Sequence, residues 1–412
     1  MALNLETFHH GIGSVGDLPI PFETVLNISA WVIILTFVFL KISWKKSVLT
    51  QKEVIVEKRQ PRLGKVFGIL LLSLLILPGL IGNEEAKTSI TPLIIWVFLW
   101  IGVPVFGLVF GDIYTKFNPL SIIPSPEKKP STVWFAVALF LGLTWFELVW
   151  RKPGNPTHIG IVFILLILIT TGARILFGKA SIEVDPLHLL HHLYAKLRFT
   201  VSKPIYKNML ENLANLSNFK GMEYFILLMI GTVTYDGLRG TTFWYNLFGS
   251  STLDITFSTI AFFGINIIII CSYRFACWFA IKVSGEKQDL NKISLLFGHT
   301  MLPIAFAYHV THYISLLLYE SQTILYRLND PYGIGWNLFD IDEVTINYFL
   351  TPVALWGIQV FVTLAGHMLS VILAHDLAIK LFGHQQSDKT QYVFLLITVG
   401  LTLQALFVLS VP

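Results

Sequence analysis

Apolar residues along the chain gather into ten long runs that short polar segments separate. A helix needs about 20 apolar residues to cross the roughly 30 Å hydrocarbon core of a bilayer. The runs cover about residues 25–43, 65–83, 91–111, 132–150, 157–178, 222–239, 254–281, 293–318, 348–380 and 391–411. The pattern therefore predicts an all-α, polytopic transmembrane helix bundle of about ten spans, with residues 1–412 forming a single integral membrane domain.

Basic residues are divided unequally between the two sets of loops that these spans define. The segments 41–65, 112–131, 179–220, 282–292 and 380–389, together with Arg174 and Arg274, hold 24 of the 29 Lys and Arg residues. Because cytoplasmic loops carry the excess of basic residues, this set is predicted to face the cytoplasm. Ten spans then place the N-terminus and the C-terminus outside, with residues 1–24 as an extracytoplasmic tail.

Two connecting segments are longer than a simple turn requires. In residues 179–221, a helix is predicted to begin at Asp185-Pro186 and to carry an apolar stripe beside a stripe of histidines, namely His188, His191 and His192. That pattern is typical of an amphipathic helix on the cytoplasmic membrane surface. Residues 319–347 are rich in turn residues and interfacial aromatics, which predicts an extracytoplasmic loop.

Composition narrows the class of protein further. Hydrophobic residues make up 54% of the chain and charged residues 13%, with a mean hydropathy of +0.67, whereas soluble domains carry about 25% charged residues. The net charge of +4 is spread over short loops, so no nucleic-acid partner is expected. Cys271 and Cys277 lie in one apolar run, which excludes a disulfide framework or a thiolate zinc site.

Ionisable residues inside predicted spans are costly and mark functional sites. His309 and His312 lie three residues apart, so a helix turns both imidazoles to one face. Asp236 lies at a similar depth near the outer end of the sixth span, and imidazole and carboxylate groups suit Cu, Zn, Fe or Ni. The sequence predicts an outer metal cluster of these three residues. Its accessory groups are Glu147, Arg239, which is also a local partner for Asp236, and the tail residues His9 and His10.

A second set of ionisable residues lies toward the cytoplasmic side of the eighth and ninth spans. His299 precedes His309 by about 15 Å along a helix axis, and His367 and His375 lie about 12 Å apart on nearly one face of the ninth span. These spacings predict an inner cluster of His299, His375 and Asp376, with His367 near mid-membrane. Gly298 and Gly366, directly before two of the histidines, predict close contacts between helices.

Two cofactor arrangements bear on these histidines. His299 and His312 have the spacing of two haem ligands on one helix, but His367 and His375 lie only eight residues apart, so a single haem between spans eight and nine is favoured over paired haems. The segment 188–192 matches the HxxHH box of membrane desaturases. The cytoplasmic side offers no second box, which disfavours a di-iron enzyme.

Several motifs along the chain occur together. They are His10-Gly11 with Asp17-Leu18-Pro19-Ile20-Pro21, Tyr235-Asp236-Gly237, Gly298-His299-Thr300 with Pro303, Tyr308-His309 with His312-Tyr313, Asp330-Pro331 with Gly335-Trp336, and Gly366-His367 with Ala374-His375. Together they resemble a group of uncharacterised multi-pass membrane proteins of bacteria and archaea. The resemblance spans most of the chain and implies that these positions form one site, without implying a particular chemistry.

The leading hypothesis is a protein of the prokaryotic cell membrane that binds a transition metal (Cu, Fe or Zn) or haem through histidine, in metal handling or membrane redox chemistry. The alternative is a proton-coupled transporter or channel that uses the same His and Asp residues as a relay, because histidine titrates near working pH. A third hypothesis is a non-catalytic subunit of a larger membrane complex. Besides the lipid bilayer, only this third hypothesis requires partners.

Overall fold

The computed structural model describes residues 21–49, 62–118, 120, 131–199, 209–216 and 218–410. Within these ranges the chain is helical and contains no β-strand beyond an isolated bridge between Thr132 and Lys220. The predicted all-α fold is therefore confirmed for the described part of the chain. His9 and His10 lie outside the described residues.

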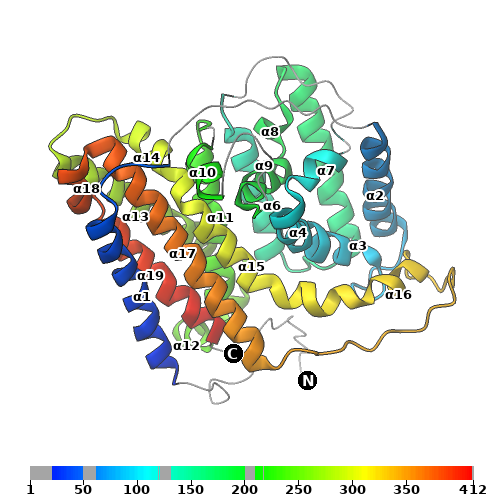
Figure 1. Cartoon of the computed structure of the whole chain (residues 1–412). Coiled ribbons are helices and arrows are strands. Elements are labelled where there is room, and N and C mark those ends of the chain that lie inside the picture. Colours follow the sequence, from blue (N-terminus) through cyan, green and yellow to red (C-terminus); the bar gives the residue numbers. More distant parts are fainter. Residues whose placement is uncertain are drawn as a thin grey trace.

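The helices follow one another along the whole chain (Figure 1). The first half contains α1 (Phe22–Ser43), α2 (Arg62–Ile81), α3 (Ile90–Pro92), the π-helix η2 (Leu93–Gly102), α4 (Val103–Phe110), α5 (Ile113–Phe117), α6 (Trp134–Leu148), α7 (Pro156–Phe177), α8 (Ser181–Val184), α9 (Pro186–Tyr194), η4 (Ala195–Leu197) and α10 (Met209–Ala214). The second half contains α11 (Met222–Arg239), α12 (Thr242–Phe248), η5 (Gly249–Leu253), α13 (Ile255–Ser284), α14 (Leu290–Gly298), η6 (His299–Met301), α15 (Leu302–Tyr319), η7 (Glu320–Thr323), α16 (Ile324–Asn329), α17 (Pro352–Phe382), α18 (His384–Thr390) and α19 (Tyr392–Ser410).

Seven helical stretches are long and apolar enough to cross a membrane. They are Phe22–Ser43, Ile90–Phe110, Pro156–Phe177, Ile255–Ser284, Leu290–Asn329, Pro352–Phe382 and Tyr392–Leu409. Two of the other predicted spans correspond to shorter apolar helices, Val66–Ile81 and Trp134–Leu148, and the third corresponds to α11, which carries charged residues at both ends. The chain is therefore a multi-pass membrane protein.

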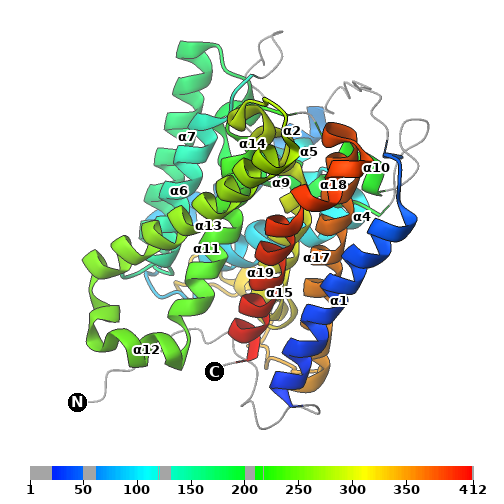
Figure 2. The same cartoon turned by 90° about the vertical axis from the view of Figure 1, so that its left-hand side faces the viewer.

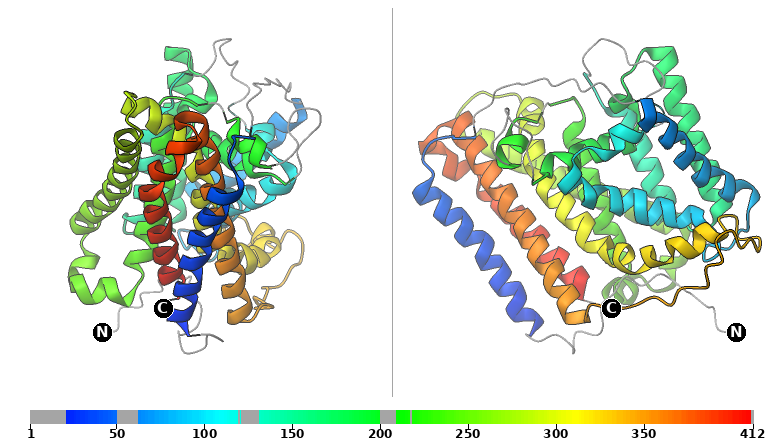
Figure 3. Two further views of the ribbon diagram at one scale, coloured as in Figure 1. Left: turned by 60° about the vertical axis from the view of Figure 1, so that its left-hand side comes forward. Right: turned by 45° about the vertical axis from the view of Figure 1, so that its right-hand side comes forward.

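The long helices form two groups on either side of α11 and α15 (Figures 1 and 3). On one side α1, α17 and α19 pack against one another, and on the other α2 packs on α7. Between them α15 contacts both α17 and α11, and α11 also packs on α13 and α6. Figure 2 shows α12 connecting the ends of α11 and α13. Residues on α11 and α15 consequently lie at the centre of the bundle.

Three helices begin with the same two-residue signal. Asn155-Pro156, Asp185-Pro186 and Thr351-Pro352 precede α7, α9 and α17, and in each pair the first side chain accepts a hydrogen bond from a backbone N–H of the first turn. Such a cap satisfies a donor that has no partner inside the helix, and proline at the first position loses no internal bond. The start of α9 at Pro186 was predicted from this signal.

Glycines next to the core histidines allow helices to approach closely, as predicted. A Cβ atom added at Gly366 would lie 2.7 Å from the carbonyl oxygen of Pro303 on α15, and one added at Gly298 would lie 2.6 Å from Cβ of Glu223 on α11. Both distances are too short for real atoms. Only glycine therefore permits the observed contacts of α17 with α15 and of α14 with α11.

The predicted surface location of the histidine helix in residues 179–221 is wrong. α9 packs among α4, α5, α6 and α15, and Leu189, Leu190 and His191 are each at most 3% exposed. Apolar residues also lie beside the histidine stripe, so the helix has no face suited to water and folds back into the bundle. His191 consequently faces the inside of the protein, whereas His188 and His192 are partly buried.

Candidate functional site

The candidate span Ile90–Phe110 is irregular at its centre, where the π-helix η2 changes into α4 at Val103. In a π-helix each N–H bonds to the carbonyl five residues earlier, and in an α-helix to the carbonyl four residues earlier. Pro104 has no N–H, so it cannot donate to Leu99 in the first pattern or to Trp100 in the second. Two consecutive carbonyl groups are thereby left short of a donor in the middle of a span.

Two histidines from distant helices bind these two carbonyls. His191 on α9 places Nε2 2.9 Å from the oxygen of Leu99, and His309 on α15 places Nε2 2.9 Å from the oxygen of Trp100. Because a carbonyl only accepts, the imidazole of His309 donates an N–H from Nε2 to Trp100. The side chains of α9 and α15 therefore complete the bonding that Pro104 interrupts.

The hydrogen bonds of His191 depend on its protonation. Its Nδ1 atom lies 2.6 Å from the carbonyl oxygen of Leu187, so both ring nitrogens face acceptors. A neutral imidazole has one N–H and satisfies one of these contacts, whereas the charged form satisfies both. Burial lowers the pKa of His191, and the two carbonyls oppose that shift without reversing it. The neutral imidazole therefore donates either to Leu99 on η2 or to Leu187 on its own helix, and after proton uptake it donates to both.

An outer cluster surrounds Asp236 on α11. Its carboxylate accepts hydrogen bonds from His312 Nε2 at 2.9 Å and from Tyr313 Oη at 2.9 Å, and it pairs with Arg239 Nε at 3.2 Å. The side chains of Asp236 and His312 are only about a tenth exposed. The structure therefore brings Asp236 and His312 together as predicted, and the predicted local pair with Arg239 is also present.

The outer cluster approaches His309 through Tyr313. The ring of Tyr313 lies 5.2 Å from the ring of His309 and 4.8 Å from that of His312, measured between centroids. Glu147 on α6 lies within electrostatic range of Asp236 and Arg239, and its Oε2 atom has no hydrogen-bond partner in the described part of the chain. His309 therefore faces Trp100 on one side and the Asp236 cluster on the other.

A further cluster, the Asp112 cluster, lies where α5 meets α9. Sequence reasoning missed it. Asp112 accepts hydrogen bonds from Thr115 Oγ1 at 2.6 Å and from His192 Nδ1 at 3.3 Å, and the Thr115 hydroxyl also lies 2.9 Å from Nε2 of His188. The ring of Tyr114 stacks on His191 at 4.7 Å. Two features of the sequence could have predicted this cluster. They are the HxxHH segment at 188–192 and Asp112, which directly follows a proline-containing apolar run.

The pKa values in the Asp112 cluster are shifted by burial and by hydrogen bonds. Burial alone would raise the pKa of Asp112, but the bonds from His192 and Thr115 lower it well below its ordinary value of 3.8. Burial lowers the pKa of His188 and His192 below the ordinary 6.5, and the charge of Asp112 only partly opposes this shift. At neutral pH the cluster therefore combines an ionised carboxylate with neutral imidazoles.

The predicted inner cluster of His299, His375 and Asp376 is not assembled as one group. Asp376 accepts hydrogen bonds from the segment after α1, at Trp44 Nε1, Ser47 and the backbone of Val48. His375 contacts Gln391 and the carbonyl of Trp44, and Nδ1 of His299 has no partner among the described residues. Asp376 and His375 instead fasten α17 to the end of α1.

The described side chains do not fit the three-ligand metal sites that the sequence predicted. Among them, no three His, Cys, Asp or Glu groups are placed to hold one metal ion. In the outer set His309 turns to the carbonyl of Trp100, while His312 binds Asp236. The imidazoles of His309 and His312 thus already form hydrogen bonds with a carbonyl oxygen and a carboxylate.

The fold and these clusters define a class, namely multi-pass helical membrane proteins with buried ionisable groups in the core. No protein-family model, curated protein or solved structure matches the chain. The function is therefore argued from the arrangement of the side chains alone.

Proposed function

We propose that the protein is a proton-coupled transporter or channel in which histidine and aspartate side chains relay protons across the membrane. The observation that carries this proposal is the position of His191 and His309 on consecutive carbonyls of a broken span. They lie between the outer carboxylate Asp236 and the inner carboxylate Asp112. Broken helices with freed carbonyls near mid-membrane are typical of transporters.

The relay uses groups that exchange protons without redox chemistry. A proton taken up at the Asp236 cluster passes by His312 and Tyr313 to His309, whose ring is 5.2 Å from that of Tyr313. His309 and His191 lie within electrostatic range of each other. From His191 the proton passes beside the stacked ring of Tyr114 to His188, Thr115 and Asp112. Imidazole suits this role because one ring nitrogen can accept a proton while the other releases one.

The proposal includes the topology predicted from the sequence. With ten spans in the cell membrane and both termini outside, Asp236 lies near the extracytoplasmic surface and Asp112 directly after a span on the cytoplasmic side. The division of basic residues, 24 of 29 in one set of loops, supports this orientation. The relay would then connect the two sides of the membrane.

The test is proton flux into liposomes that contain the purified protein and a pH-sensitive dye. Asp236→Asn and His309→Gln are expected to slow flux about 100-fold or more, because one positioned proton-transferring group typically contributes about 10²–10⁴-fold. His384→Gln, at an exposed histidine of α18, is the matched control and is expected to leave flux unchanged. Wild-type flux in both core variants would overturn the proposal.

The metal or haem hypothesis and the subunit hypothesis stay predictions. Absence of flux in the wild-type protein, together with a stoichiometric metal, would replace the relay by the metal hypothesis. Co-purification of fixed partners would favour a subunit of a complex.

A further inference from the structure

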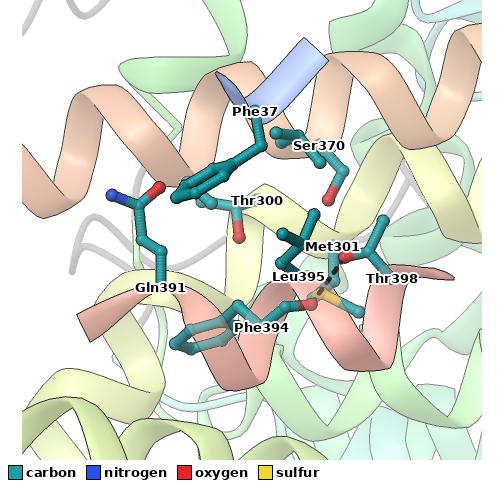
Figure 4. Close-up of a pocket in the computed structure, with 10 residues that line it drawn as sticks. Phe37, Thr300, Met301, Ser370, Gln391, Phe394, Leu395 and Thr398 are labelled. Atoms are coloured by element: carbon teal, nitrogen blue, oxygen red, sulfur yellow. Dashed lines mark hydrogen bonds between the residues drawn. The ribbon is translucent and has the colours of Figure 1, made fainter. Parts of the chain in front are cut away.

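A hollow at the end of α13 is large enough to hold a small ligand. It has a volume of about 530 Å³ and is lined by Ile281, Lys282, Gly285, Glu286, Lys287 and Gln288. Sites for small molecules have volumes of about 300–1,000 Å³. The cavity between α1, η6, α17 and α19 (Figure 4) offers only about 10 Å³, which is room for about one water molecule. The hollow on α13 is therefore the better candidate for a binding site.

The helix that leads to this hollow lies at the edge of the bundle (Figure 3). Only 11% of the most apolar 18-residue stretch of α13 is buried, against 28–72% in the other candidate spans. Most of the surface of α13 is therefore exposed. In a membrane protein, an exposed apolar span faces the acyl chains of lipids.

One face of α13 is apolar over nearly the thickness of a hydrocarbon core and then ends in a lysine. The exposed residues of this face follow at intervals of seven or four residues, close to whole helical turns, and are Ile260, Ile267, Cys271, Trp278 and Lys282. Ile260 and Trp278 lie about 27 Å apart along the helix axis, and a hydrocarbon core is about 30 Å thick. Lys282 lies about one turn further, at the level of the lipid headgroups.

The side chains at this end of α13 suit a membrane interface. Nζ of Lys282 lies 6.0 Å from the centre of the Trp278 ring, and Trp278 stacks on Phe275 at 5.6 Å between centroids. Tryptophan is enriched where acyl chains meet headgroups, and lysine extends from there toward the phosphates. Arg274, the one charged residue inside this stretch of α13, donates to the hydroxyl of Tyr224 on α11 at 2.6 Å and is held against the bundle.

The charges that line the hollow favour an anion. Lys282 and Lys287 line it together with Glu286, whose carboxylate accepts a hydrogen bond from Gln288 Nε2 at 2.9 Å. Residues 282–292 belong to the loops that are rich in basic residues. The proposed topology places these loops in the cytoplasm, and the cytoplasmic leaflet carries anionic lipids that basic pockets bind.

We propose that the hollow binds the headgroup of an anionic phospholipid, whose acyl chains lie along the exposed face of α13. The occupant is a lipid because the hollow continues the lipid-facing surface of a span. The ammonium groups of Lys282 and Lys287 contact the phosphate, and the indole ring of Trp278 lies between headgroup and acyl chains. The site goes beyond the proposed relay and is independent of it, because α13 carries none of the relay residues.

Native mass spectrometry of the purified protein tests the site by measuring the affinity for the first lipid bound. Phosphatidylglycerol is compared with phosphatidylcholine of the same acyl chains. Each basic residue near a bilayer surface contributes about fivefold to the binding of an anionic lipid, so two lysines against one glutamate give phosphatidylglycerol an advantage of about fivefold. Lys282→Gln combined with Lys287→Gln should abolish this advantage, and Glu286→Gln should raise it to about 25-fold.

Lys45→Gln combined with Lys46→Gln is the matched control. It removes two exposed lysines from another basic segment and is expected to leave the advantage of phosphatidylglycerol unchanged. An advantage that survives in the variant at Lys282 and Lys287, or that falls equally in the control, would overturn the proposal. Displacement of phosphatidylglycerol by excess inorganic phosphate would also overturn it, because the site would then bind free anions. Absence of proton flux from a protein that keeps the lipid preference would contradict the relay alone.

Discussion

Replacement of Asp236 by asparagine removes a charge at the centre of the outer cluster with almost no change in shape. The carboxylate accepts from His312 and Tyr313 through one oxygen and pairs with Arg239 through the other. The amide oxygen of asparagine can still accept, but its NH₂ group faces a guanidinium that only donates. The variant therefore keeps two weaker hydrogen bonds and loses the ion pair.

The expected cost follows from these three contacts. A hydrogen bond to a charged group contributes about 1.5–3 kcal/mol and a neutral one about 0.5–1.5 kcal/mol, so the bonds from His312 and Tyr313 weaken by about 1 kcal/mol each. The side chain of Arg239 is 40% exposed, so its ion pair adds about 0–1 kcal/mol. The free energy of unfolding should fall by about 2–3 kcal/mol, which leaves a protein of ordinary stability folded.

Denaturant titration of the purified protein in mixed micelles measures this change. The set comprises wild type, Asp236→Asn, His312→Gln and the double variant, with Asp254→Asn as control, because Asp254 is an exposed helix cap and asparagine caps equally well. We expect a coupling energy of about 1 kcal/mol between positions 236 and 312. Additive losses, or a loss in Asp236→Asn no larger than in the control, would refute the assigned contacts.

Three further outcomes follow from the structure. Burial lowers the pKa values of the partly buried His188 and His192 below 6.5, so the unfolded chain binds protons before the folded protein does as pH falls. Their contribution to stability is complete above pH 6.5 and declines below it, so the fall in melting temperature between pH 8 and 5 should be smaller in His192→Gln. The contribution of Asp112, whose pKa is lowered, is lost only below its ordinary pKa of 3.8, outside this pH range. Gly366→Ala should cost about 1–3 kcal/mol by overpacking against α15, while Gly357→Ala, with no atom within 4 Å of the new methyl group, should not destabilise in the same melting experiment. Elemental analysis of protein purified without chelators or a nickel column tests the metal hypothesis, which expects near-stoichiometric Cu, Fe or Zn that is lost at acid pH and in a His309→Ala, His312→Ala variant; background metal would contradict it.

Local patterns predicted the helices and part of the site. Apolar runs indicated where helices lie, the spacing of motifs placed Asp236 beside His312, and the glycine before His367 indicated a close helix contact. The π-helix was not predictable, because its ten residues are uniformly apolar and only Pro104 marks the change of hydrogen-bond pattern. The burial of α9 was missed because it depends on packing against α4, α5 and α15, which no local pattern encodes.

The bonds at Leu99 and Trp100 also bear on how the chain is made. The partner of Leu99 follows 92 residues later in the sequence and the partner of Trp100 follows 209 residues later. At a synthesis rate of about 5–20 residues per second, His309 is synthesised about 10–40 s after Trp100. During that interval the carbonyl of Trp100 lies inside a nascent span without its final donor, so the centre of the bundle is among the last parts to be completed.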